Sequence, residues 1–140
     1  LKAQQCLASI LPYPAIHTPM LSHLRGELDK ALEGEHFAIG KPTMTLYSSI
    51  TTEPYPSEQE AVRHTLALNL DHPLRVWQTI KRMYEDGVRI FVQVGGGHMA
   101  ARVQDFTREG EPAVAVALDV DNRNPLTQLN HLLATLFVAG

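Results

Sequence analysis

The chain has 140 residues, a length that predicts one domain or part of a larger one rather than an array of domains. Hydrophobic residues make up 44% of the sequence and charged residues 19%, which argues against intrinsic disorder and predicts a hydrophobic core. Twelve Lys and Arg against 15 Asp and Glu give a net charge of −3, so no basic surplus exists to bind a phosphate backbone. A nucleic-acid partner is not expected.

The apolar runs predict no membrane span, and the single cysteine is consistent with a reducing compartment. No apolar run reaches the roughly 20 residues needed to cross a bilayer, and the polar residues 1–5 lack the order of a signal peptide. Cys6 cannot form an internal disulfide. We therefore expect a cytoplasmic protein without a membrane partner. Because the chain begins at Leu1 and ends on the apolar residues 132–140, we also expect a segment of a longer polypeptide.

The first third of the chain predicts a strand, a helix and a second strand. Residues 6–11 form a short apolar run that ends at a proline, which is typical of a buried strand. Thr18 followed by Pro19 is a helix start, and apolar residues then recur at helical spacing up to Gly34. Residues 43–50 are rich in β-branched and aromatic side chains, so they predict a strand followed by an exposed loop.

Two further helices are predicted in the middle of the chain. Ser57 and Glu60 have the spacing of a capping box, and the helix that they start runs to about residue 67. Pro73 interrupts the pattern. The next helix spans residues 74–85 and ends at Gly87 as a left-handed cap. Its large side chains share one face, where packing explains them without a ligand: Trp77, Met83 and Tyr84.

The remaining elements alternate between strand and helix. Residues 88–94 are apolar enough for a strand buried on both faces, and three glycines at 95–97 lead into a helix over 98–106. Residues 112–118 predict another strand, and a last helix runs from Pro125 to the end. This alternation predicts an α/β fold with a largely parallel sheet flanked by helices.

His17 is the sharpest single candidate for chemistry. It stands in a loop between the strand at 6–11 and the next helix, where open α/β sheets commonly place functional groups. Imidazole has an unperturbed pKa near physiological pH, so His17 suits the role of a general base. The alternative is a loop histidine bonded to nearby backbone.

Three other kinds of site can be judged from their spacing. The glycine turn at 95–97 could approach an anion, but it matches neither phosphate-binding fingerprint. A tight turn that brings the helix against the sheet is therefore the favoured interpretation. The seven histidines show no metal-binding spacing, so no metal site is expected. No serine lies in a G-x-S-x-G elbow, so the chain lacks the usual partner of a catalytic histidine; the serines are Ser9, Ser22, Ser48, Ser49 and Ser57.

Three segments in fixed order together resemble one protein family. They read A-I-H-T-P-M at 15–20, N-L-D-H-P-L-R-V-W at 69–77 and G-V-R-I-F-V-Q-V-G at 87–95. With L-Y-S-S-I-T at 46–51, they resemble the C-terminal part of the acyltransferase domain of polyketide and fatty-acid synthases, the malonyl-CoA:acyl carrier protein transacylase family. The tail at 126–133 resembles the region that follows this domain in synthases of the iterative, polyunsaturated-fatty-acid or glycolipid type.

The resemblance implies roles for two residues. His17 matches the base that activates a serine, and Asn69 matches the position whose amide or main-chain carbonyl orients that imidazole. The family's serine elbow, oxyanion glutamine and carboxylate-binding arginine would all lie upstream of this chain. Two departures, Gln93 for glutamate and Gly96 for proline, fall in the turn after the third motif. Ile16 stands where an aromatic residue often accompanies malonyl selectivity, so the acyl group is not assigned.

The resemblance also implies a division of the chain and a set of partners. Residues 1–13 would end a ferredoxin-like small subdomain, 14–118 would belong to the hydrolase-like large subdomain, and 119–140 would form a following helix or linker. No cofactor is implied: the substrate would be malonyl-CoA or a related acyl-CoA, the acceptor a carrier-protein phosphopantetheine, and the other partner the rest of the synthase. The alternative is a stand-alone, non-catalytic α/β binding or interaction module with an anion-binding glycine turn.

Overall fold

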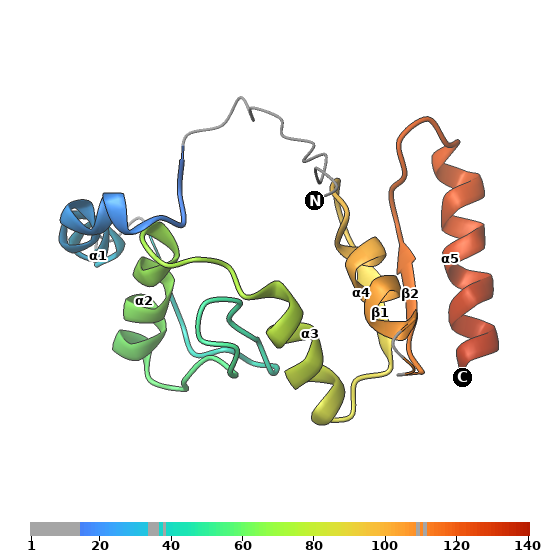
Figure 1. Ribbon diagram of the computed structural model, residues 1–140, viewed down its shortest axis with the longest axis horizontal. Coiled ribbons are helices and arrows are strands. Elements are labelled where there is room, and N and C mark those ends of the chain that lie inside the picture. Colours follow the sequence, from blue (N-terminus) through green and yellow to red (C-terminus); the bar gives the residue numbers. More distant parts are fainter. Residues whose placement is uncertain (1–14, 34–36, 38, 109, 111) are drawn as a thin grey trace, which may run out of the picture.

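The computed structural model describes residues 15–33, 37, 39–108, 110 and 112–140 (Figure 1). The strand expected at 6–11 lies outside these residues. The elements in chain order are η1 (Pro19–Leu24), α1 (Arg25–Leu32), α2 (Gln59–Ala67), η2 (Leu68–Leu70), α3 (Val76–Glu85), β1 (Ile90–Gln93), α4 (Met99–Arg108), β2 (Val114–Ala117) and α5 (Pro125–Ala139), where η marks a 3₁₀ helix.

A parallel pair of strands forms the sheet of the described chain. Ile90 of β1 pairs with Val114 of β2, and the register continues to Gln93 and Ala117. Helix α4 connects the two strands and packs on both, while α5 packs along β2, as Figure 1 shows. The predicted α/β class, with a parallel sheet and flanking helices, is confirmed.

The core lies where α3 and α4 meet the sheet. Its buried members are Ile80, Val103 and Phe106, and the partly buried Phe91 of β1 packs against them. The Phe106 ring makes edge-to-face contacts with Trp77 and Tyr84, at centroid distances of 5.4 and 5.3 Å. Packing thus accounts for both of these aromatic residues of α3, as the helical spacing predicts.

The third motif, residues 87–95, begins at the C-terminal cap of α3 and leads into β1. Gly87 has a φ of +98°, its N–H donates to the carbonyl of Tyr84, and the N–H of Val88 donates to that of Met83. This pair of bonds is a Schellman motif, which needs a left-handed residue at the position after the cap. The predicted glycine cap is confirmed.

The last helix begins where it was predicted. The Asn124 side chain accepts from the N–H groups of Leu126 and Thr127, and Pro125 occupies the first helical position. Gln128 is 3% exposed, and its amide donates to the carbonyl of Ala117 at 2.5 Å. A buried side-chain amide therefore joins α5 to the end of β2.

The prediction of a strand at 43–50 is wrong. This segment makes only an isolated antiparallel bridge between Tyr47 and Pro54. Between them the backbone forms local hydrogen bonds. The N–H of Ser48 donates to the carbonyl of Glu53, and the carbonyl of Ser48 accepts from the N–H of Thr52. The Ser48 side chain is buried and accepts from the N–H of Ile50. These local bonds form a tight loop and leave no continuous ladder for a strand.

The boundaries of three predicted helices need correction. The helix after Thr18 winds as a 3₁₀ helix as far as Leu24 and becomes α-helical from Arg25. The expected capping box does not form, since Glu58 is the N-cap of α2 and the Ser57 hydroxyl donates to the Glu58 carboxylate at 3.4 Å. Helix α3 begins at Val76, after the interruption that Pro73 predicts.

The expectation that β1 is buried on both faces is also wrong. Phe91 packs on the core, whereas Val92 is 42% and the following Val94 76% exposed. The described helices cover the side of β1 that carries Phe91, so Val92, which points to the opposite side, remains accessible.

Among the described residues, no helix is long and apolar enough to cross a membrane.

Candidate active site

His17 has an unusual backbone and a half-buried ring. Its φ is +62°, a left-handed backbone conformation that residues other than glycine rarely adopt and that costs of order 1–3 kcal/mol. Its N–H donates to the carbonyl of Leu70 at 2.9 Å. The ring nitrogen Nδ1 is buried and makes no hydrogen bond within the described part of the chain. The loop is therefore held in a strained shape by a contact from a distant segment.

Asn69 lies in that distant segment, but its side chain faces the preceding helix. The Asn69 Nδ2 group donates to the carbonyls of Leu66 at 3.1 Å and Thr65 at 3.4 Å. These bonds satisfy backbone acceptors at the end of α2. The structure thus brings the His17 loop beside the Asn69 turn, and the hydrogen bond that joins them is donated by the His17 N–H to the carbonyl of Leu70.

Asp71 is a buried charge that sequence reasoning missed. Its side chain is 2% exposed, and it accepts from Arg25 Nη1 at 3.1 Å and from His72 Nδ1 at 2.7 Å. Burial raises the pKa of this carboxyl, but hydrogen bonds from His72 and Ser22 and the charge of Arg25 outweigh burial and hold the pKa below its usual range. No local pattern reveals this pair, because Arg25 stands 46 positions earlier.

The glycine turn after β1 is closed by Gln93, one of the two departures from the family pattern. Its amide nitrogen donates to the carbonyls of Gly95 at 2.9 Å and Gly97 at 3.1 Å, and its amide oxygen accepts from the N–H of Ala100. Gly95 and Gly97 both have positive φ. The turn is thus organised by bonds within the chain, in the way that a tight turn between strand and helix requires.

Replacing Gln93 by Glu is expected to lower the free energy of unfolding by about 1–2 kcal/mol at pH 7. A carboxylate can still accept from Ala100, but it cannot donate to the two glycine carbonyls. Urea denaturation followed by circular dichroism measures the loss. The control is Gln104→Glu on the exposed side of α4, which makes the same charge change and should stay within about 0.5 kcal/mol of the parent. Equal losses in both variants would contradict this account of the turn.

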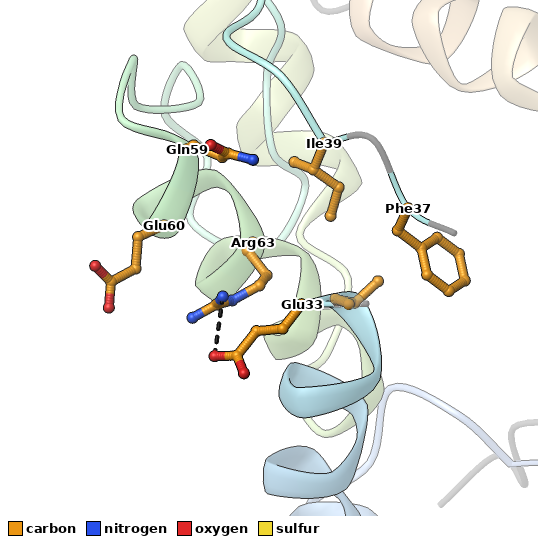
Figure 2. Close-up of a pocket in the computed structure, with 7 residues that line it drawn as sticks. Glu33, Phe37, Ile39, Gln59, Glu60 and Arg63 are labelled. Atoms are coloured by element: carbon orange, nitrogen blue, oxygen red, sulfur yellow. Dashed lines mark ion pairs between the residues drawn. The ribbon is translucent and has the colours of Figure 1, made fainter. Parts of the chain in front are cut away.

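The cavity drawn in Figure 2 lies between the end of α1 and the start of α2. It has a volume of about 410 Å³, and its lining residues are Leu32, Glu33, Phe37, Ile39, Gln59, Glu60 and Arg63. The Arg63 guanidinium pairs with Glu33 at 3.0 Å and with Asp29 at 3.2 Å. None of the residues predicted for the site lines this cavity. Its cationic side chain, Arg63, is already paired with Asp29 of α1 and with Glu33, which follows α1.

The histidines do not assemble into a metal site within the described residues, where no group of three His, Cys, Asp or Glu side chains could hold an ion. His72 pairs with Asp71, and the Nδ1 atom of His23 lies 3.1 Å from the carbonyl oxygen of Met20.

Three curated proteins are similar in sequence. A polyketide biosynthesis malonyl CoA-acyl carrier protein transacylase of Bacillus velezensis is 31% identical over 105 residues, which cover 71% of this chain and 34% of that protein. A polyunsaturated fatty acid synthase polypeptide of Thraustochytrium is 22% identical over 90% of this chain and 4% of that protein. A 5-methyl-1-naphthoate synthase of Streptomyces sahachiroi is 26% identical over 79% of this chain and 6% of that protein. No family model matches the chain.

A solved structure confirms the fold. The malonyl CoA-acyl carrier protein transacylase of Clostridium perfringens superposes with a TM-score of 0.71 at 22% identity, covering 92% of this chain and 39% of that one. The chain thus spans about a third of the curated transacylase and much less of the two synthases. At low identity and partial coverage, its relatives are malonyl-CoA:acyl carrier protein transacylases and synthases of the polyketide and polyunsaturated-fatty-acid kind, which confirms the resemblance inferred from the three motifs.

Proposed function

We propose that this chain forms the C-terminal part of an acyltransferase domain within a larger synthase. The domain transfers an acyl group, malonyl as the first expectation, from coenzyme A to the phosphopantetheine thiol of an acyl carrier protein. The observation that carries the proposal is the contact between the first two motifs: the strained His17 loop is held by the carbonyl of Leu70. Strained backbone of this kind clusters at functional sites, which supports a functional role for this loop.

In this proposal the nucleophilic serine lies outside the chain. His17 takes the proton of the serine hydroxyl while the serine oxygen attacks the thioester carbonyl, and the departing coenzyme A thiolate receives that proton. In the second half-reaction, His17 removes the proton of the phosphopantetheine thiol, whose sulfur attacks the acyl-serine ester. The proton then returns to the serine oxygen. His17 is unchanged over one cycle, as a general base must be.

The ring geometry is compatible with this role. Nδ1 is the buried nitrogen of His17, so Nε2 is the nitrogen left to exchange protons with a serine or a thiol. A base works best when its ring is held in one orientation and one tautomer. In the proposal the turn that contains Asn69 holds the His17 backbone through the carbonyl of Leu70, while the Asn69 side chain ties the turn to α2.

The division of the chain follows from the same proposal. Residues 1–13 end the ferredoxin-like small subdomain, 14–118 complete the large subdomain, and 119–140 form the helix that follows the acyltransferase. The match of 92% of the chain to a transacylase fold supports the large subdomain. The same match covers 39% of that structure. In the proposal, other residues supply the rest of the domain, including its nucleophile.

The 140-residue chain alone is expected not to load a carrier protein. The experiment mixes malonyl-CoA and a phosphopantetheinylated carrier protein with either this chain or the complete domain of its parent protein, and follows the mass of the carrier. Only the complete domain should add a malonyl group, because the chain has no G-x-S-x-G nucleophile. Loading by the chain alone that depends on His17 would contradict the missing-serine proposal. Failure of the complete domain with malonyl-CoA and related acyl-CoAs would overturn the function itself.

A further inference from the structure

The segment from His17 to Arg25 is held at both ends by two consecutive residues of one turn. At one end the N–H of His17 donates to the carbonyl of Leu70 at 2.9 Å. At the other, Arg25 Nη1 donates to the carboxylate of Asp71 at 3.1 Å. Between these two contacts lies η1, which begins at Pro19 and runs into α1. The geometry of the His17 loop is therefore coupled to that of the Asp71 carboxylate.

Asp71 is a firm anchor because both of its oxygens are engaged. Oδ2 accepts from Arg25, and Oδ1 accepts from His72 at 2.7 Å. The carboxylate is 2% exposed, whereas the Arg25 side chain is 40% exposed. A buried carboxylate that loses its cation is left with a large desolvation cost, so the turn and the start of α1 are strongly bound to each other.

The turn is itself fixed to α2. Asn69 bonds to the carbonyls at the end of that helix, and the N–H groups of Asp71 and His72 both donate to the carbonyl of Leu68. The carbonyl of Leu70 consequently has little freedom relative to α2. The Arg25–Asp71 pair sets the position of η1 and the start of α1 against this turn, and the Asp29–Arg63 pair joins α1 to α2 farther along the helix. In Figure 1, α1 lies beside α2 at the end of the molecule opposite to α5.

We propose that Asp71, through its ion pair with Arg25, is a positioning residue for His17. The inference rests on the proposed function, in which His17 is the base. Asp71 touches neither substrate nor the reacting atoms; it holds η1 so that the His17 backbone keeps its left-handed shape and the ring keeps its orientation. A displacement of about 1 Å in a catalytic group can cost on the order of 100-fold in rate, so a remote ion pair can matter greatly.

The test uses the complete acyltransferase domain with Asp71→Asn, Arg25→Gln and the double variant. Either single change should lower kcat for malonyl transfer by roughly 10-fold or more, and the double variant should be no slower than the slower single. The KM for malonyl-CoA should change by less than about twofold, because no substrate contact is removed. A second readout is independent of turnover: the rate at which diethyl pyrocarbonate modifies His17, followed by peptide mass spectrometry, should rise in each variant.

The matched control is Asp29→Asn. Asp29 pairs with Arg63 and so also joins α1 to α2, but Arg63 keeps its second partner Glu33, and these ion pairs do not involve the residues of the turn. This variant should retain the parent kcat and the parent modification rate of His17. Equal losses of kcat in Asp29→Asn and Asp71→Asn would show a general effect of weakened helix packing and would overturn the proposal.

The outcomes separate this inference from the function on which it rests. If His17→Ala abolishes transfer while Asp71→Asn and Arg25→Gln alter neither kcat nor the modification rate, the function stands and the positioning role is wrong. If His17→Ala retains transfer, the proposed function fails, and the modification rate alone reports whether Asp71 orders the loop. Should Asp71→Asn fail to fold, Arg25→Gln decides the question, because Arg25 is the partly exposed member of the pair.

Discussion

Replacing His17 by Ala in the complete domain is expected to lower acyl transfer to the carrier protein by roughly 100-fold or more. The change removes the only group in the proposed cycle that takes a proton from the serine and later from the thiol. Steady-state transfer of radiolabelled malonyl groups measures the loss. His98→Ala, at an exposed position before α4, is the matched control and should transfer normally.

Asn69→Ala in the same assay should cost less than His17→Ala. Its side chain holds the turn to the end of α2, so its loss loosens the support of the base without removing the base. A double variant no worse than His17→Ala would show that the two residues serve one function. If the fold losses in transfer rate of the two single variants multiply in the double variant, the two residues have independent roles. If His17→Ala transfers at a near-normal rate, His17 is an ordinary loop residue.

The features predicted well from the sequence are those whose signals are local. A threonine before a proline marks the start of η1, and Gly87 marks the end of α3, because the bonds of a helix cap involve residues only a few positions apart. The parallel pairing of β1 and β2 follows from the helix between them, since a crossover connection favours parallel strands.

The segment at 43–50 shows where local reasoning failed. Its β-branched and aromatic residues favour extended backbone, yet a strand needs a partner, and propensity does not supply one. Ser48 instead bonds to the backbone of the next three residues and buries its hydroxyl. Side chains that bond to nearby backbone compete with a ladder, and here they prevail.

The candidate site was predictable in part for the same reason. His17 could be singled out from its position between a predicted strand and a helix start, and the family motif added Asn69. The Arg25–Asp71 pair could not be predicted in this way, because no local sequence pattern indicates that two charged residues far apart in the chain will form an ion pair. Nor could the sequence reveal that the Asn69 amide faces α2 and that the carbonyl of Leu70 holds His17.

Replacing Phe106 by Ala is expected to cost about 3–5 kcal/mol of stability, a large share of what a single domain possesses. Phe106 is 4% exposed and lies at the centre of the core, in contact with the rings of Trp77 and Tyr84. Its removal would leave a cavity that α4 cannot readily close, because this helix is also packed on both strands of the sheet. Urea denaturation monitored by tryptophan fluorescence is suited to the measurement, since Trp77 packs directly on the ring.

The control for this change is Val92→Ala in β1. Val92 was expected from its apolar run to be as deeply buried as its neighbours, but it is 42% exposed, so its truncation should cost less than about 1 kcal/mol. Phe91→Ala should fall between the two variants, because Phe91 is partly buried and packs on the same cluster as Phe106. The order Phe106, Phe91, Val92 therefore tests which face of β1 the described helices cover. A Val92→Ala variant as unstable as Phe106→Ala would mean that the outer face of the strand is packed against further residues when the protein is folded.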